Sequence, residues 1–208
     1  MRSTGVTRTF VCIELPASIR AQAEALQASL AAQNTKIRWV NPANLHLTLR
    51  FLGEISRSQV ETVCLAVRSA AAGIDAFPIH FSGTGCFPSS RRPRTFWIGV
   101  AESADVVRLF EAVEEQLFTA GFPREARPFS PHLTLGRIRA EGSGARLGET
   151  LGQTEFDAAP FPVTEVTVMK SDLRSTGAVY APIARVRLRS ADVKQREPEN
   201  SRFISPDG

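Results

Sequence analysis

The sequence contains the same four residues, His-Leu-Thr-Leu, at two widely separated positions. The first copy is residues 46–49 within "LHLTLRF", and the second is residues 132–135 within "PHLTLGRI". The chain has three histidines, and two of them begin these copies. Average residue usage gives any one histidine roughly one chance in a thousand of being followed by Leu-Thr-Leu. Two such copies indicate an internal duplication, with the motifs at equivalent points of two lobes.

The hydrophobic pattern around the two copies supports the duplication. Runs rich in β-branched and aromatic residues indicate strands, and apolar residues at helical spacing indicate helices. In the first half the pattern predicts strands at 7–15, 37–40, 45–53 and 77–87 and helices at 16–33 and 56–73. In the second half it predicts strands at 94–101, 132–138, 161–173 and 178–188 and helices at 103–121 and 143–153. Each half therefore reads strand–helix–strand–helix–strand, with one motif on its middle strand.

Two of the predicted helices have recognisable ends. The helix at 56–73 can begin at Ser56 or Ser58. The helix at 103–121 is expected to be capped by Ser103 and to end at Gly121. Hydroxyl side chains favour the position before a helix, and glycine favours the position after it.

Strand geometry predicts which side chains of each motif share a face. Because successive side chains of a strand point to opposite faces, the leucines should be buried and the histidine and threonine should face a polar region. In the first copy the polar face holds His46, Thr48 and Arg50, and the apolar face holds Leu45, Leu47, Leu49 and Phe51. In the second copy the polar face holds His132 and Thr134. A pseudo-twofold axis between the lobes would bring both pairs together around one cleft.

Two histidines and two threonines suit a particular chemistry. An imidazole pair supplies one general base and one general acid near neutral pH. Threonine hydroxyls can hydrogen-bond the non-bridging oxygens of a phosphodiester, where charge grows in the transition state. A histidine nucleophile and a repeat kept only for packing remain open. No carboxylate cluster or Cys/His ligand set accompanies the motifs, so we expect neither a metal nor a cofactor.

The amino-acid composition limits which binding partners and which cellular compartment are expected. Lys and Arg number 25 against 21 Asp and Glu, a mild positive balance that suits RNA without requiring it. The cysteines, Cys12, Cys64 and Cys86, are odd in number and form no C-x-x-C pair, so no disulfide framework or zinc site is indicated. The short apolar run at the N-terminus and the lack of a long apolar segment predict a cytoplasmic protein with no membrane contact.

Five stretches of the sequence carry a resemblance to a known family. They are "RTFVCIELP", "IRWVNPANLHLTLRFLGEI", "TFWIGV", "FPREARPFSPHLTLGRI" and "SDLRSTGAVYAPI". Together they resemble the two-histidine phosphoesterase superfamily, and within it the bacterial and archaeal RNA 2′,3′-cyclic phosphodiesterases, also called 2′–5′ RNA ligases. The resemblance covers about residues 8 to 189.

The resemblance implies both a fold and an activity. The fold is a bilobal α+β fold, a duplicated βαβαβ unit with antiparallel sheets around a central cleft. The activity is opening of a 2′,3′-cyclic phosphate at an RNA end to a 2′-phosphomonoester, without metal or nucleotide. By microscopic reversibility the same site should weakly join such an end to a 5′-hydroxyl through a 2′–5′ bond.

The resemblance also implies roles for individual residues. His46 is similar to the proton donor, and His132 is similar to the proton acceptor for the water. Thr48 and Thr134 match the phosphate-binding threonines, and Arg137 matches a basic position that holds the phosphate.

Arg137 and Phe51 occupy matching positions, each five residues after a motif histidine. Strict alternation puts Arg137 on the leucine face, so a role at the phosphate requires a bulge or strand end at Gly136. Phe51 either stacks on a nucleobase or packs in the interior. The loop containing Arg91, Arg92 and Arg94 is either a solvated turn or a grip on RNA phosphates.

The predicted organisation is simple. Residues 1–7 form a short extension, residues 8–189 one bilobal domain, and residues 190–208 a polar, disordered tail. We expect a monomer whose partner is RNA with a 2′,3′-cyclic phosphate end, and no obligate protein partner. Two alternatives stay open: an enzyme acting on a small cyclic nucleotide or ADP-ribose cyclic phosphate, and a non-catalytic RNA-binding module. His80, in "FPIHFSG", is expected to be structural.

Overall fold

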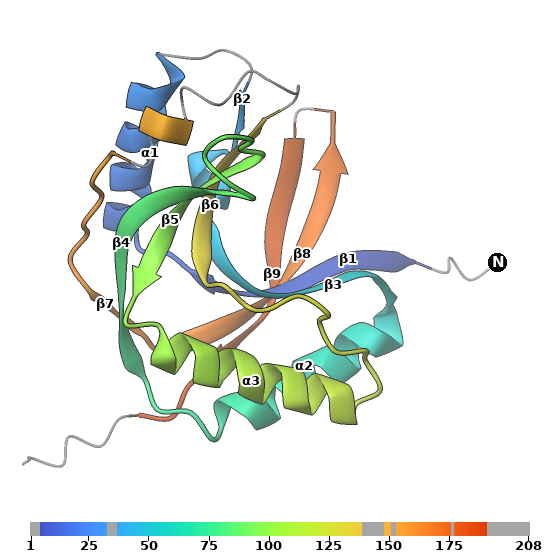
Figure 1. The fold of residues 1–208 in the computed structure, drawn as a ribbon. Helices are drawn as coiled ribbons and strands as arrows, with labels where there is room; N and C mark the ends of the chain where they lie inside the picture. The colour runs from blue at the N-terminus through green and yellow to red at the C-terminus, as the bar shows by residue number, and fades with distance from the viewer. Residues whose placement is uncertain (1–4, 33–36, 139–147, 151–152, 176, 191–208) are drawn as a thin grey trace, which may run out of the picture.

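The computed structural model describes residues 5–32, 37–138, 148–150, 153–175 and 177–190 (Figure 1). Its strands are β1 (Val6–Glu14), β2 (Ile37–Trp39), β3 (His46–Ser56), β4 (Phe77–Phe87), β5 (Thr95–Ala101), β6 (His132–Ile138), β7 (Phe161–Val163), β8 (Glu165–Arg174) and β9 (Gly177–Arg187). Its helices are α1 (Ala17–Ala31), α2 (Arg57–Ala71), α3 (Ala104–Thr119) and the short 3-10 helix η1 (Pro42–Asn44). The helix predicted at 143–153 lies mostly outside the described residues, although 148–150 are helical. The extension predicted at 1–7 and the tail predicted at 190–208 also lie largely outside them.

The strand order shows the duplication directly. The sheet runs β7-β4-β5-β6-β3-β1-β8-β9, and β2 adds to β6. The pairs between these strands are antiparallel. We call β3-β1-β8-β9 the first lobe and β6-β5-β4-β7 the second lobe. The strand that ends each half pairs in the other half's lobe, because β4 lies against β5 and β8 lies against β1. The predicted bilobal α+β fold is confirmed, with its two sheets joined into one curled sheet.

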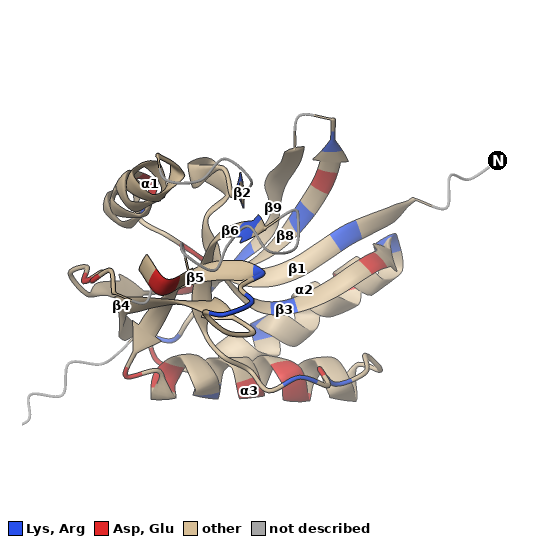
Figure 2. Cartoon of the chain, turned by 45° about the horizontal axis from the view of Figure 1, so that its top comes forward, with Lys and Arg blue, Asp and Glu red and all other residues tan. Residues whose placement is uncertain are grey.

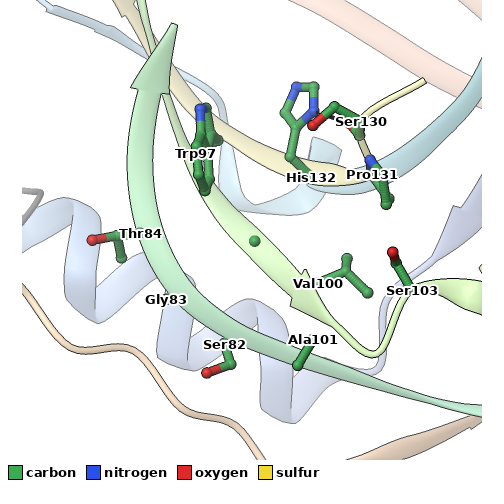
Figure 3. Close-up of a pocket in the computed structure, with 11 residues that line it drawn as sticks. Ser82, Gly83, Thr84, Trp97, Val100, Ala101, Ser103, Ser130, Pro131 and His132 are labelled. Atoms are coloured by element: carbon green, nitrogen blue, oxygen red, sulfur yellow. Dashed lines mark hydrogen bonds between the residues drawn. The ribbon is translucent and has the colours of Figure 1, made fainter. Parts of the chain in front are cut away.

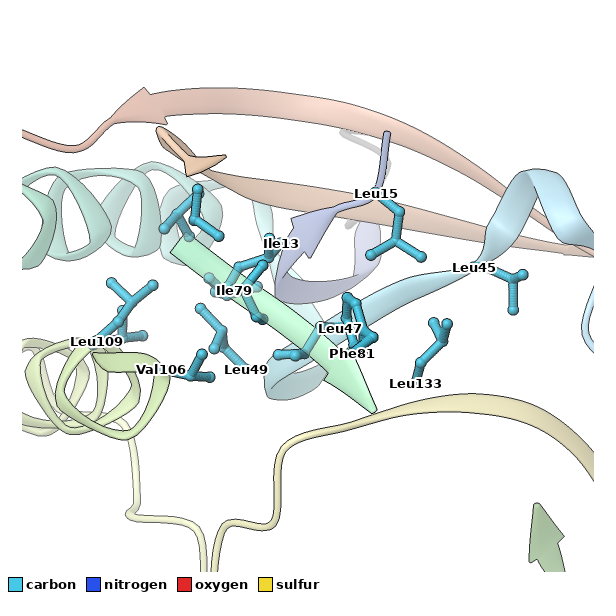
Figure 4. Close-up of a cluster of buried hydrophobic side chains, with 14 of the residues drawn as sticks. Ile13, Leu15, Leu45, Leu47, Leu49, Ile79, Phe81, Val106, Leu109 and Leu133 are labelled. Atoms are coloured by element: carbon cyan, nitrogen blue, oxygen red, sulfur yellow. The ribbon is translucent and has the colours of Figure 1, made fainter. Parts of the chain in front are cut away.

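The two lobes meet where the repeated motifs pair with each other. Leu47 of β3 lies opposite Leu133 of β6, and both side chains are fully buried. They point to the face that the helices cover, into one core shared by both lobes (Figure 4). The helices contribute apolar residues at helical spacing, among them Ile19, Ala23 and Leu30 of α1, Val63, Val67 and Ala70 of α2, and Val106, Leu109 and Val113 of α3. The motif leucines are therefore core residues, as alternation predicts.

The helix ends agree with the sequence in two places and differ in one. Ser56 begins α2 with a full capping box, in which its hydroxyl accepts from the Gln59 N–H and the Gln59 side chain accepts from the Ser56 N–H. Gly121 follows α3 with a φ of 91°, which glycine adopts without strain. Ser103 stands at the cap position of α3, but its side chain makes no capping hydrogen bond. The hydroxyl of Ser103 lines a pocket instead.

Arg50 does not follow the simple alternation of side chains predicted for β3. The partners of β1 step from Cys12 opposite Thr48 to Val11 opposite Arg50, which leaves Leu49 as an extra residue in a bulge. Leu49 and Arg50 are consequently both buried, and the prediction that Arg50 shares a face with His46 is wrong.

The Arg50 guanidinium lies among carboxylates of the α3 region. Its Nε is 2.6 Å from Glu114 Oε1, an ion pair whose geometry is not that of a hydrogen bond. Its Nη1 donates to Glu125 at 3.0 Å, and its Nη2 donates to the Pro123 carbonyl at 2.5 Å. The pair with Glu114 is buried on both sides, so each charge depends on the other.

We expect Glu114→Gln to lower the free energy of unfolding by about 3 kcal/mol, because it leaves part of a buried charge uncompensated. The matched control is Glu61→Gln, which removes the carboxylate of an exposed pair with Arg57 at 3.6 Å. That control should cost about 0.5 kcal/mol or less. Urea unfolding of both variants measures the difference, and equal losses would show that the buried pair is not structurally important.

Candidate active site

Both nitrogens of the His46 ring take part in hydrogen bonds. Nδ1 lies 2.8 Å from the carbonyl oxygen of Asn44, and Nε2 lies 2.9 Å from the Thr48 hydroxyl. A carbonyl only accepts, so Nδ1 carries a proton and donates it. Asn44 is itself fixed, because its side-chain amide donates to the Ala178 carbonyl at 2.7 Å. The arrangement leaves Nε2 as the nitrogen that exchanges a proton with a ligand.

His132 is held in the same way. Its Nδ1 lies 2.7 Å from the carbonyl oxygen of Ser130, which is again two residues before the histidine. Nδ1 therefore donates, and Nε2 is the exchangeable position. The two motif histidines share one tautomer and one mode of support, as equivalent residues of a duplicated unit should.

The β3–β6 pairing brings the motif side chains together. Leu47 is paired with Leu133, and the antiparallel direction of the two strands sets His46 towards Thr134 and Thr48 towards His132. Since the two leucines share the helix-covered face, the two histidines and two threonines share the other face. We call this the histidine face.

A second bulge turns Arg137 to the histidine face. The partners along β5 step from Trp97 opposite Thr134 to Phe96 opposite Gly136, so Leu135 is the extra residue. Leu135 and Gly136 are buried, and Arg137 is exposed. The bulge predicted as a condition for Arg137 to face the site is therefore present.

The carbonyl oxygen of Leu135, inside this bulge, accepts two hydrogen bonds. It accepts from the Val40 backbone N–H at 2.9 Å and from the buried Gln27 side chain at 2.8 Å. Gln27 lies on α1 and also donates to the Val40 carbonyl at 2.9 Å. Helix α1 therefore supports the bulge that aims Arg137.

The corresponding bulge in β3 places Phe51 on the histidine face. Strict alternation puts Phe51 with the leucines, and that prediction is wrong because Leu49 is the extra residue of the bulge. Phe51 is 46% exposed and lies against Phe10, with ring centroids 5.7 Å apart. Phe10 also stacks on His46, at 4.7 Å, and meets the edge of Tyr180 at 5.0 Å.

Phe10 and Tyr180 are site residues that sequence reasoning missed. Both lie on strands that carry no motif, β1 and β9, and their positions depend on strand pairing. The "RTFVCIEL" run marks Phe10 as a strand residue but gives no sign that it touches a histidine. Only the register of β1 against β3 supplies that information.

Burial lowers the pKa of both motif histidines below the ordinary value. In each case the backbone hydrogen bond to Nδ1 opposes this effect and the positive charge of Arg137 adds to it. Arg137 therefore acts on both imidazoles. The difference between them is Glu14, whose negative charge raises the pKa of His46 and is not among the causes for His132.

Strand pairing accounts for this difference. Glu14 of β1 lies opposite His46, whereas Gly99 of β5 lies opposite His132. Glu14 is itself held by hydrogen bonds from Thr167 at 2.8 Å and from Arg185 at 2.9 Å. Burial raises the pKa of the Glu14 carboxyl, but these two partners and nearby arginines outweigh it, so its pKa is lowered. Glu14 thus stays ionised beside His46.

The other residues singled out from the sequence lie elsewhere. His80 is separate from the pair and lies 2.6 Å from Asp157, which fits its expected structural role. Arg91 and Arg92 are exposed in the turn between β4 and β5, and the Arg94 carbonyl accepts from the Ile138 N–H near the end of β6. Figure 2 shows basic residues on β1 and near β2 and β6, and acidic residues along α3.

The described residues contain no group of three or more His, Cys, Asp or Glu side chains arranged to hold a metal ion. No described helix combines the length and apolar character needed to cross a membrane.

Comparison with known proteins gives consistent matches. The family model "LigT like Phosphoesterase" matches twice, over residues 13–97 and 98–180. An RNA 2′,3′-cyclic phosphodiesterase of Methanothermobacter thermautotrophicus is 29% identical, over 87% of this chain and 98% of its own. The Aquifex aeolicus protein of the same name is 31% identical, over 86% of this chain and 95% of its own. The crystal structure of Escherichia coli LigT with 3′-AMP matches with a TM-score of 0.71 and 28% identity, covering 88% of this chain and 99% of that one.

We expect Glu14→Gln to lower the pKa of His46 and to leave that of His132 nearly unchanged. The carboxylate favours the charged imidazolium, so removing its charge makes His46 lose its proton at a lower pH. NMR titration of the histidine ring signals measures both values. The control is Glu165→Gln, which removes another carboxylate near Arg185, at 3.7 Å, but not one of the groups acting on His46. An unchanged His46 in the Glu14 variant would show that the two groups are not coupled.

Proposed function

This chain belongs to the LigT-like phosphoesterase family, and we propose that it hydrolyses 2′,3′-cyclic phosphate ends of RNA to 2′-phosphomonoesters. The observation that carries the proposal is the pairing of Leu47 with Leu133, because it sets two histidines and two threonines on one exposed face. An RNA-binding module without catalysis would not need two imidazoles with matched tautomers and exchangeable Nε2 atoms.

The two histidines divide the proton transfers in this proposal. His132 Nε2 takes a proton from the attacking water, and His46 Nε2 gives a proton to the departing 3′ oxygen. In-line displacement at phosphorus needs a base and an acid on opposite sides, and one histidine per lobe meets that need. Glu14 supports the assignment, since its charge favours the protonated form of His46, whereas no carboxylate of the described residues is among the causes for His132.

Charge on the phosphate oxygens is met by three further groups. The hydroxyls of Thr48 and Thr134 lie beside the histidines and can donate to the non-bridging oxygens. Arg137 is exposed on the same face and contributes a positive charge near both imidazoles. Phe51 offers a half-exposed ring on which the nucleobase of the cyclic phosphate can stack.

The proposed reaction uses no metal and no nucleoside triphosphate. Both proton transfers are assigned to imidazoles, and the developing charge is assigned to Arg137 and the threonines. The same groups can run the reaction in reverse, with a 5′-hydroxyl in place of water, to give a 2′–5′ bond. Water at high concentration competes, so hydrolysis should dominate.

We expect His46→Ala and His132→Ala each to lower the hydrolysis rate about 10² to 10⁴-fold, the usual contribution of a positioned acid or base. The hydrolysis rate of the double variant should be only slightly lower than that of the less active single variant, because a concerted pair fails when either member is lost. The assay follows an oligonucleotide ending in a 2′,3′-cyclic phosphate. His80→Ala is the matched control and should keep near-normal turnover, because His80 pairs with Asp157 away from the site. Near-normal turnover of His46→Ala would exclude the proposed mechanism.

We expect the product to carry its phosphate on the 2′ oxygen, because His46 protonates the 3′ oxygen. Chromatography of the terminal nucleotide against 2′ and 3′ standards identifies the product. A mainly 3′-phosphate product would reverse the roles of His46 and His132.

We expect the reaction to run at an unchanged rate in excess EDTA and without ATP. Loss of activity in EDTA, with recovery on adding a divalent ion, would require a different mechanism. A mononucleotide 2′,3′-cyclic phosphate, assayed alongside, tests whether small cyclic nucleotides are the better substrate.

A further inference from the structure

A pocket of about 450 Å³ lies beside His132, on the histidine face of the second lobe (Figure 3). Ser82, Ser103 and Ser130 line it together with Thr84, whose hydroxyl donates to the Thr154 carbonyl at 2.8 Å, and its largest apolar surface is the indole of Trp97. None of the residues that line it carries a full charge apart from a protonated His132. The pocket therefore suits a neutral group with an aromatic ring and hydrogen-bonding edges.

Glycines of β4 and β5 allow Trp97 to form this wall. The indole lies over Gly85 and Gly99, and a Cβ on either glycine would press against its ring atoms. A Cβ on Gly99 would also come within 2.9 Å of the Ser82 carbonyl oxygen. The flat ring can lie against the sheet only because these two positions have no side chain.

The equivalent place in the first lobe carries a charged side chain. Gly99 is the residue opposite His132, and its counterpart opposite His46 is Glu14. Glu14 accepts from Thr167 and Arg185, so a polar network lies where the second lobe has a glycine. The two lobes share a backbone plan but differ in this respect, and the difference gives the site a direction.

The pocket extends along β5 away from the positive charge of Arg137. Along β5, Thr95 lies opposite Arg137, Trp97 opposite Thr134 and Gly99 opposite His132. Residues beyond Gly99, such as Ala101, line the pocket. Arg38 lies opposite Arg137 on β2 and adds charge at the far end. The positive charge thus lies at one end of this face, and the uncharged pocket runs from Trp97, opposite Thr134, past Gly99 to Ala101.

We propose that this pocket binds the nucleoside whose 5′-hydroxyl attacks the cyclic phosphate in the joining reaction, and which departs when a 2′–5′ bond is cleaved. The inference rests on the proposed function, in which His132 is the base on the nucleophile side. In joining, the 5′ oxygen bonds to phosphorus and gives its proton to His132. The bond from phosphorus to the 3′ oxygen breaks, and His46 protonates that oxygen. The product is a 2′–5′ phosphodiester beside a free 3′-hydroxyl.

The first lobe is left for the nucleoside that bears the cyclic phosphate. In-line geometry places that nucleoside on the leaving-group side, next to His46. The exposed ring of Phe51 and the edge of Tyr180 lie in that lobe. Each lobe thus has its own surface for a base, the exposed Phe51 ring in the first lobe and an uncharged pocket walled by Trp97 in the second.

The test fills the pocket with a larger side chain and compares two reactions that the full-length protein would catalyse. Ala101→Leu places a larger side chain in the pocket, and Ala101→Val is a smaller step in the same direction. Hydrolysis of an oligonucleotide 2′,3′-cyclic phosphate should stay within about twofold of the unchanged protein. Cleavage of a 2′–5′-linked dinucleotide should fall about tenfold or more through a higher KM, as expected when a stacked base is lost. Ala21→Leu, an exposed position on α1, is the matched control and should change neither.

A substrate without the departing base gives a second comparison. A 2′–5′-linked dinucleotide that is abasic on the 5′-hydroxyl side should be cleaved equally by the unchanged protein and by Ala101→Leu. Equal losses in hydrolysis and in cleavage of the ordinary dinucleotide would overturn the proposal, because the pocket would then serve the cyclic-phosphate nucleoside. No loss in either reaction would overturn it as well.

A binding measurement separates this proposal from the proposed function. The chain has two tryptophans, so a Trp39→Phe variant reports Trp97 alone. Adenosine, which has a 5′-hydroxyl and no phosphate, should quench that fluorescence, and Ala101→Leu should remove the effect. If the unchanged protein failed to hydrolyse the cyclic phosphate, the proposed function would fall while this quenching could still be observed. Hydrolysis without quenching by adenosine would overturn the pocket assignment alone.

Discussion

The position of the histidine face depends on one antiparallel contact, between Leu47 and Leu133. Both side chains are fully buried, so their burial holds the two lobes in register as well as contributing to the core. A slip of one residue would send the leucines to solvent and the histidines into the interior, at a large cost in free energy. The same apolar contact that joins the lobes therefore fixes where the two motif histidines lie, and stability and the proposed function share one constraint.

The duplicated unit becomes useful where its two copies differ. Both copies have a bulge after the threonine, and both use it to turn the residue five places beyond the histidine onto the same face. In one copy that residue is Phe51 and in the other it is Arg137, so equivalent backbone positions offer an aromatic surface and a charge. The neighbouring strands add Glu14 beside His46 and Gly99 beside His132. These differences give the two motif histidines different surroundings, which the proposed division into acid and base requires and two identical lobes could not provide.

The sequence predicts the elements and the four motif side chains well, and the reasons are local. The repeated His-Leu-Thr-Leu carries its own alternation, and helices such as α2 carry caps and apolar spacing that need no partner. Alternation fails at Arg50 and Phe51, because a bulge is a property of two paired strands and one strand alone does not show it. Tyr180 and Glu14 were missed for the same reason, since each reaches His46 from a strand distant in sequence. The roles proposed for the site residues rest on family resemblance and chemistry rather than on the fold.

The exchange of end strands between the lobes has a consequence for how the chain is made. The first lobe consists of β1 and β3 from the beginning of the chain and β8 and β9 from its end, whereas the strands of the second lobe come from its middle and later part. During synthesis β1 and β3 leave the ribosome first, yet the edge of β1 that β8 will cover stays open until translation is nearly finished. An open apolar edge, with Phe10 and Cys12 beside it, is the kind of surface that associates with other chains. The first-made part of the protein is thus the last to be completed, and its β1 edge is paired only when β8 has been made.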